Sequence, residues 1–170
     1  GSSEFSIDNV SVKEVTSYSG GGFERDAYKL VEDTSSGQHY INSYGFSGSV
    51  GEYYSYSVYA KAGERDYMYL GSKYSTPFSG GMNAYFNLSD GTIGTVVGAT
   101  SASITSMSNG WYRCSISAVC TATNSTQFRT YTSDADNSAS YQGDGTSGIY
   151  IAYAQLEESD YASSLMLPTT

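Results

Sequence analysis

Aromatic and basic side chains alternate with small or aliphatic ones in four segments of the sequence. In an extended strand, successive side chains point to opposite faces, so alternate residues share a face. One set of alternate positions carries small or apolar side chains, and we predict that these form the core: Val58, Ala60, Met68, Leu70, Cys114, Ile116, Ala118 and Phe128. The other set is aromatic or basic: Tyr59, Lys61, Tyr67, Tyr69, Trp111, Arg113, Arg129 and Tyr131. If the four segments share a sheet, the second set forms one surface of rings and cations.

Such a surface has the chemistry needed to contact a carbohydrate. The apolar C–H faces of sugar rings stack on Tyr and Trp, and an Arg guanidinium can donate two hydrogen bonds to a carboxylate. A basic patch on a chain of net charge −9 favours an anionic polymer, such as a uronate or sulfated polysaccharide. The alternative is that these residues face solvent and support cross-strand pairs, because Tyr is a good strand former. Trp111 can also pack structurally at a sheet edge. We expect Tyr69→Ala or Arg129→Ala to weaken binding and leave the melting temperature nearly unchanged.

Catalytic patterns have weak support, and we expect no enzyme activity and no catalytic residue. A glycoside hydrolase needs two carboxylates across a cleft. Pairs such as Glu32/Asp33 are adjacent in sequence and would point to opposite faces of a strand. His39 is the only histidine, and no GxSxG elbow accompanies it, so we assign it to structure or to ligand contact.

Two other residue groups could do chemistry. Asp134, Asp136 and Asp144 lie in segments rich in oxygen ligands and are candidates for a structural Ca²⁺. The alternative is turn chemistry, since Asp favours turns; no cofactor is otherwise required. Cys114 and Cys120 are six residues apart, too far for a disulfide along one extended strand, so we expect two buried free thiols.

Composition indicates an all-β fold. Among 170 residues there are 18 Tyr, 19 Gly and only 2 Pro, and 15% of residues are charged. This mixture suits short strands joined by polar turns better than long helices. The net charge of −9 argues against nucleic-acid and anionic-membrane partners, which need a basic footprint. No apolar run approaches the roughly 20 residues of a membrane helix.

Turn signals divide the chain into many short strand candidates. The clearest is YYSYSVYAKA (53–62). The others are the segments 6–16, 27–33, 39–46, 66–72, 83–89, 92–98, 101–107, 110–122, 126–133 and 148–157. Frequent turns and no helical period indicate a two-sheet antiparallel β-sandwich or a barrel. The remaining tail after residue 157 could wrap the sandwich edge.

The segments also form a familiar series. Taken in order, six of them resemble a concanavalin-like, jelly-roll β-sandwich module: AYKLVEDTSSGQHYI, YSYSVYAKAGER, FNLSDGTIGTV, NGWYRCSI, SGIYIAYAQLEE and YASSLMLPT. Such modules occur in phage tail and tailspike proteins and in bacterial polysaccharide-degrading enzymes, and they are similar to carbohydrate-binding modules. The resemblance spans residues 23–170 and implies a jelly-roll fold. The chain departs from it at Ala152-Tyr153, where relatives often carry a Trp and a Gly.

The resemblance and the residues lead to one organisation and three candidate functions. We assign residues 1–22 to a tag remnant, a leftover strand that could add as an edge strand, and a Gly-rich linker; residues 23–170 form the sandwich. The expected function is non-catalytic binding of a polysaccharide on behalf of an attached catalytic or tail domain, either secreted or on a phage virion. The alternatives are an assembly or receptor-binding domain of a phage fibre or adhesin, and a β-sandwich polysaccharide lyase.

Overall fold

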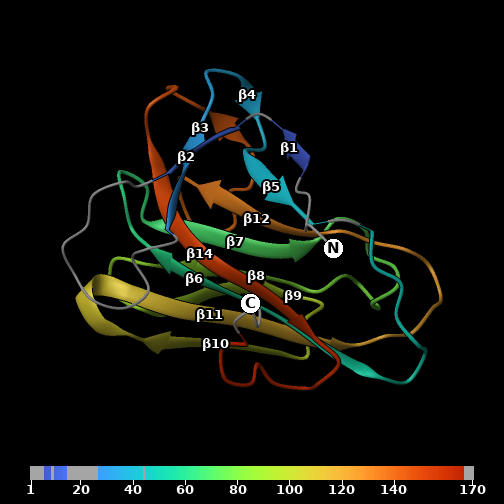
Figure 1. Ribbon diagram of the computed structural model, residues 1–170. Helices are drawn as coiled ribbons and strands as arrows, with labels where there is room; N and C mark the ends of the chain where they lie inside the picture. Colours follow the sequence, from blue (N-terminus) through green and yellow to red (C-terminus); the bar gives the residue numbers. More distant parts are fainter. Residues whose placement is uncertain (1–5, 9, 15–26, 44, 167–170) are drawn as a thin grey trace.

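The chain folds as two antiparallel sheets packed face to face (Figure 1). The computed structural model describes residues 6–8, 10–14, 27–43 and 45–166. Sheet A has six strands, in the spatial order β1 (Ser6–Asp8), β5 (Tyr40–Asn42), β12 (Phe128–Ser133), β7 (Tyr67–Ser72), β8 (Asn83–Asn87) and β9 (Thr92–Val97). Sheet B also has six, in the order β10 (Ser101–Ser106), β11 (Trp111–Val119), β6 (Tyr53–Lys61), β14 (Gly148–Glu157), β3 (Tyr28–Glu32) and β2 (Val10–Glu14). The predicted β-sandwich is confirmed.

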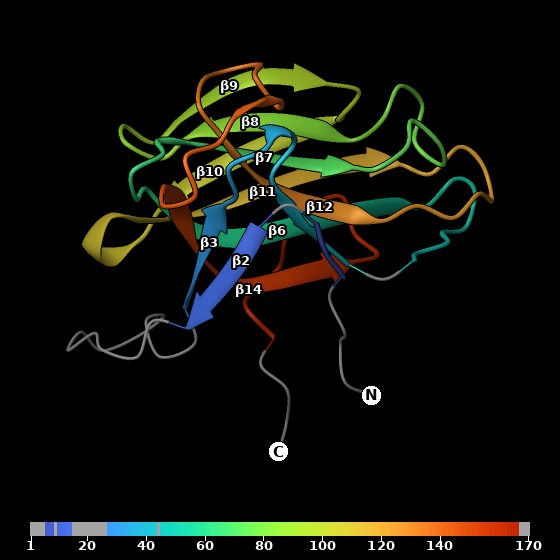
Figure 2. The ribbon, with the colours of Figure 1, turned by 90° about the horizontal axis from the view of Figure 1, so that it is seen from above.

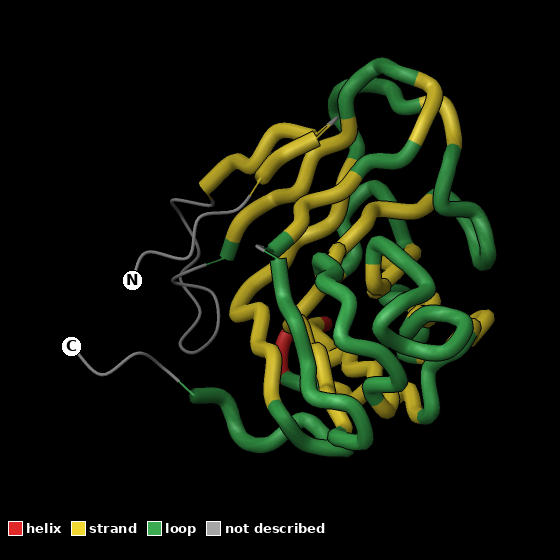
Figure 3. Tube along the Cα trace, turned by 90° about the vertical axis from the view of Figure 1, so that its right-hand side faces the viewer, coloured by secondary structure: helices red, strands yellow, loops and turns green. Residues whose placement is uncertain are grey.

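Two short strands, β4 (Ser36–Gly37) and β13 (Tyr141–Gln142), pair with each other beside the two large sheets. Figure 2 shows β7, β8 and β9 in one layer and β6, β11 and β14 in the other. Loops make up most of the remainder, together with a 3₁₀ turn at Ser108–Gly110 (Figure 3). No helix in the described ranges is long and apolar enough to cross a membrane.

The core lies between the sheets and contains the small and apolar residues that alternate along the strands. All eight predicted core residues belong to the main buried cluster, each with 2% or less of its surface exposed. Tyr56 of β6 and Phe128 of β12 join the two sheets, because their rings stack with centroids 5.1 Å apart. The Tyr56 hydroxyl shares a 3.0 Å hydrogen bond with Thr130, and burial raises the pKa of Tyr56 to about 12. Period-two alternation therefore identified the inner face of these strands correctly.

Both cysteines are free and buried, as predicted. Cys114 is on β11 and Cys120 follows the end of that strand, and both belong to the core cluster.

The segment before residue 23 contributes to both sheets. β1 pairs with β5 at the edge of sheet A, and β2 pairs with β3 at the edge of sheet B. Of the two roles left open for this strand segment, a leftover of a preceding module and an added edge strand, the pairing agrees with the edge strand. The expected tag remnant at 1–5 and the Gly-rich linker lie outside the described residues.

Candidate functional site

The aromatic and basic positions fall on two sheets rather than one. Four lie in sheet B: Tyr59 and Lys61 on β6, and Trp111 and Arg113 on β11. Four lie in sheet A: Tyr67 and Tyr69 on β7, and Arg129 and Tyr131 on β12. The outer faces of two packed sheets point away from each other, so the predicted single surface is not formed. Alternation along a strand shows which of its residues share a face, but it does not show to which sheet the strand belongs.

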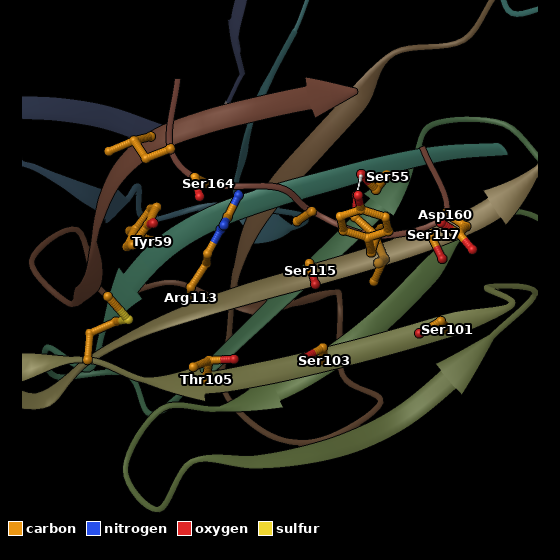
Figure 4. Close-up of a pocket in the computed structure, with 15 residues that line it drawn as sticks. Ser55, Tyr59, Ser101, Ser103, Thr105, Arg113, Ser115, Ser117, Asp160 and Ser164 are labelled. Atoms are coloured by element: carbon orange, nitrogen blue, oxygen red, sulfur yellow. Dashed lines mark hydrogen bonds between the residues drawn. The ribbon is translucent and has the colours of Figure 1, made fainter. Parts of the chain in front are cut away.

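A pocket of about 450 Å³ lies on the outer face of sheet B. Its floor is formed by β10, β11 and β6, and one side is bordered by residues 158–166, which we call the strap (Figure 4). The strap follows β14, and it is the tail that the sequence placed along the sandwich edge. It borders the pocket with Asp160, Tyr161, Ser164 and Leu165.

Hydroxyl groups line the floor of this strap pocket in a regular grid. The register places alternate residues of the three strands side by side in three rows: Ser101–Ser117–Ser55, Ser103–Ser115–Ser57 and Thr105–Arg113–Tyr59. Alternate residues of a strand share a face, so all nine point to the outside of sheet B. The segments SASIT, RCSIS and SYSVY therefore carry serine at outer positions and core side chains between them. Ser101, Ser103 and Thr105 on β10 are exposed and Ser115 is half-buried, so these four present hydroxyl donors and acceptors at the surface.

Side chains on β6, β11 and β14 hold the strap in place. Ser55 Oγ donates to the carbonyl of Tyr161 at 2.9 Å, and Arg113 donates to the carbonyl of Ser163 and, at 3.1 Å, to Ser57 Oγ. The Glu157 carboxylate accepts from the backbone N–H of Ser163. Burial opposes ionisation of Glu157, but hydrogen bonds from Ser163 and Gln155 outweigh it and lower the pKa.

The end of the pocket near Arg113 is aromatic and tightly packed. Tyr59 and Trp111 are buried in a small cluster with Ala152, and the Arg113 guanidinium lies 5.4 Å from the centre of the Tyr59 ring. Trp111 is 3% exposed and so has a packing role, which was the alternative weighed for it. Lys61 lies opposite Trp111 in the strand register and is half-buried.

A row of four tyrosines crosses the outer face of sheet A: Tyr40, Tyr131, Tyr69 and Tyr85. Their ring centroids are 5.0, 4.6 and 4.5 Å apart in that order. Arg129 lies two residues from Tyr131 on the same face, 3.9 Å from the centre of the Tyr40 ring. Tyr67 and Tyr69 are half-buried, whereas Tyr131 and Arg129 are almost completely buried. This face is thus largely closed, in contrast to the strap pocket.

His39 belongs to the interior and not to either outer face, which favours the structural role over the ligand contact also considered for it. Its side chain is completely buried, with the ring 4.8 Å from that of Tyr141 and Nδ1 3.4 Å from the Asp33 carboxylate. The same region contains a buried ion pair. The Glu32 carboxylate accepts two hydrogen bonds from Arg65 and one from Tyr141. This network connects β3 to the loop between β6 and β7 and to β13, so its role is structural.

The three predicted calcium ligands do not come together. Asp136 accepts hydrogen bonds from the backbone and side chain of Thr95, at 2.8 and 2.9 Å. Asp144 accepts from Ser147 N and Oγ, at 2.7 and 2.6 Å, whereas Asp134 is an exposed loop residue. In the described residues, no group of three or more His, Cys, Asp or Glu side chains is placed to hold a metal. The turn chemistry weighed as the alternative accounts for Asp144, whereas Asp136 bonds to Thr95 on the neighbouring β9.

Two of the predicted contact residues, Tyr59 and Arg113, line the strap pocket. The sequence did not single out Tyr161 or the serine grid. The available signal was the alternation of serine with core residues in 55–59, 101–105 and 113–117. The sequence pattern does not indicate that Tyr161 borders the grid, because the strap has no periodicity. Comparisons with protein-family models and with curated proteins gave no match to this chain.

Proposed function

We propose that the chain is a non-catalytic carbohydrate-binding module and that its glycan lies in the strap pocket. The observation that carries the proposal is the hydroxyl grid, whose exposed members Ser101, Ser103 and Thr105 and half-buried Ser115 line a pocket of about 450 Å³ bordered by Tyr59 and Tyr161. Ser and Thr hydroxyls each donate one hydrogen bond and accept two, which matches the mixed donor and acceptor pattern of sugar hydroxyls. The module would hold an attached catalytic or tail domain on its polysaccharide.

Tyr161 is suited to stack on a sugar ring. It is 67% exposed at the border of the pocket, while its backbone carbonyl is anchored by Ser55. An aromatic side chain on an anchored backbone provides contact area at low cost in conformational entropy.

The charges around the pocket favour a neutral glycan at this position. Arg113 lies 4.0 Å from the Glu157 carboxylate and donates to Ser163 and Ser57, so its charge is already compensated. Asp160 is an exposed acid at the rim. A sugar carboxylate would meet Asp160 without an uncompensated cation, whereas sugar hydroxyls can donate to it.

Affinity electrophoresis against neutral and acidic polysaccharides tests the proposal. We expect retardation of the wild-type chain by a neutral polymer and no release of product. Tyr161→Ala should weaken binding about tenfold, as is common for an exposed aromatic anchor. Tyr74→Ala is the matched control, because Tyr74 is 51% exposed and does not line the pocket.

A second pair of variants tests the floor. Ser103→Ala removes a hydroxyl of the grid, and Ser106→Ala removes one on the same strand that does not line the pocket. We expect only Ser103→Ala to weaken binding. Equal affinity of Tyr161→Ala, Ser103→Ala and the wild type would refute the site. Release of products with new ultraviolet absorbance would instead establish a lyase.

One feature favours an assembly function as the second candidate. β9 is the edge strand of sheet A, and Ile93, Val96 and Val97 on it are each more than 40% exposed. Exposed apolar edge strands can pair with another chain. If the chain shows no retardation on any polymer but associates in a concentration-dependent manner, assembly replaces carbohydrate binding as the better proposal.

A further inference from the structure

Arg129 is a buried cation without a carboxylate partner on the outer face of sheet A. Only 8% of its surface is exposed. Arg65 and Arg113, the other arginines in the described ranges, lie within 4.0 Å of a carboxylate, whereas Arg129 forms no ion pair with any described residue. Its buried Nε, like that of Arg113, has no hydrogen-bond partner among the residues that the structure describes.

The surroundings of Arg129 satisfy only a small part of its bonding capacity. A guanidinium has five N–H donors in a planar fork. Arg129 donates one hydrogen bond, from Nη1 to Tyr131 Oη at 3.2 Å, and lies over the Tyr40 ring at 3.9 Å. The ring faces partly offset the loss of water around the charge. They provide no acceptor for the other donors, and an unpaired buried charge is unfavourable.

The strand beside Arg129 adds polar groups. Its cross-strand neighbour on β7 is Gly71, which has no side chain. The side chains of Tyr69 and Asn83 lie directly over this glycine: a Cβ at Gly71 would be 2.9 Å from Tyr69 Oη and 2.5 Å from Asn83 Oδ1. Any larger residue at position 71 would collide with both groups. Glycine at position 71 thus lets the Tyr69 hydroxyl and the Asn83 side chain, which share a 3.0 Å hydrogen bond, lie over β7 beside the guanidinium.

We infer that Arg129, with the Tyr131 hydroxyl beside it, binds a small anionic group, the carboxylate or sulfate substituent of an acidic sugar. The planar fork of Arg matches a carboxylate or sulfate with two hydrogen bonds. Because Arg129 is 8% exposed, an anionic substituent can reach it more readily than a whole sugar ring. The site lies on the sheet opposite the strap pocket, so the chain would contact neutral and acidic groups on different faces. The inference does not depend on the proposed function, because it concerns a free anion as well as a polymer.

Titration with small anions tests the inference directly. The probes are sodium glucuronate for the carboxylate, sodium sulfate for the sulfate group and glucose as the neutral control, all at one ionic strength set with chloride. We expect glucuronate or sulfate to shift the Arg129 Nε–H signal in nitrogen-15 NMR spectra and to raise the melting temperature. Glucose should do neither. The anion that acts at the lower concentration identifies the substituent.

Arg129→Gln removes the charge and should weaken anion binding at least tenfold. Arg129→Lys keeps the charge but loses the planar pair of N–H donors, and should weaken glucuronate binding at least threefold. This variant replaces Arg129→Gln in the test if the Gln variant does not fold. Lys73→Gln is the matched control, because Lys73 lies 5.0 Å over the ring of exposed Tyr74 and forms a comparable cation–ring pair on the open surface.

Three results would overturn the inference: no wild-type response to either anion, an equal response to chloride, or unchanged binding by the Arg129 variants. Each leaves the strap pocket untouched, since neutral polymers are tested there. Conversely, loss of neutral-polymer retardation in Tyr161→Ala with intact glucuronate binding would separate the two sites.

Discussion

Arg65 donates two hydrogen bonds to Glu32, from Nε at 2.9 Å and from Nη2 at 2.5 Å, although the Glu32 side chain is completely buried. The same carboxylate accepts from the backbone N–H of Asp144 and from the Tyr141 hydroxyl, at 2.9 and 2.8 Å. Burial alone would raise the pKa of Glu32, but these bonds outweigh it and lower the pKa. Glu32 is therefore held as a carboxylate, and it ties β3 to the segment that precedes β14.

Glu32→Gln should destabilise the fold by about 3 kcal/mol, because removing one partner of a buried pair leaves the other uncompensated. Urea unfolding measures the loss. Glu64→Gln is the control: Glu64 pairs with Lys29 at 2.6 Å, but 53% of its side chain is exposed. Such a surface pair contributes less than about 1 kcal/mol. Equal losses in the two variants would contradict the structural role of Glu32.

The stability should also depend on Glu32 in acid. Its pKa in the folded state is below the ordinary value, so the folded state gains stability above that value and loses it as the pH falls through the folded pKa. We expect the wild-type melting temperature to decline below about pH 4.3, the ordinary glutamate value. Glu32→Gln should decline less steeply over this range. Parallel curves for the two proteins would show that other carboxylates dominate.

Tyr153 has a left-handed backbone, with φ of 46°, where β14 is irregular between Ala152 and Gln155. This backbone conformation costs residues other than glycine roughly 1 kcal/mol or more. The Tyr153 ring meets that of Tyr59 edge to face, with centroids 6.1 Å apart. Both Tyr153→Gly and Tyr153→Ala lose this contact, but only the Gly variant also relieves the backbone. We expect Tyr153→Gly to be more stable than Tyr153→Ala by about 1 kcal/mol, measured by urea unfolding. The reverse order, usual for a regular strand, would exclude backbone strain.

The two thiols should be unreactive in the folded protein. Both are buried, and burial raises the pKa of Cys114 above its usual range, so little thiolate forms there at neutral pH. Ellman's reagent should label neither thiol in the native state and both in denaturant. Rapid labelling of native protein would show that the core opens readily, and Cys114→Ala would then identify the thiol that reacts.

Tyr69 illustrates how burial changes an expectation from the sequence. Its ring lies between those of Tyr131 and Tyr85, so Tyr69→Ala should cost about 3 kcal/mol of stability, contrary to the expectation of an unchanged melting temperature. Tyr69→Phe keeps the ring and loses the 3.0 Å hydrogen bond to Asn83, which costs about 1 kcal/mol. Thermal unfolding of both variants tests this order. A small effect of Tyr69→Ala would mean that the tyrosine row does not stabilise sheet A.

The strands were predictable because their alternation is local. Val58 and Ile116 could be assigned to the core since period two requires only neighbouring residues. Which strands become neighbours depends on contacts distant in sequence: β7 pairs with β12, and β11 pairs with β6. The sequence therefore could not show that Arg113 and Arg129 lie on opposite sheets. Nor could it show that His39 is buried, because that follows from packing against Tyr141.

Strand β6 supplies the core and the pocket floor from alternate residues of one nine-residue segment. Tyr56 and Val58 face inward, while Ser55, Ser57 and Tyr59 face outward. Mutations in these two sets therefore act on different properties, one on folding and the other on the ligand surface. A lineage could change the floor residues and acquire new ligand preferences while the packing between the sheets stays constant. In such a scaffold, sequence divergence at the outer positions of β6, β10 and β11 would record changes in specificity rather than loss of the fold.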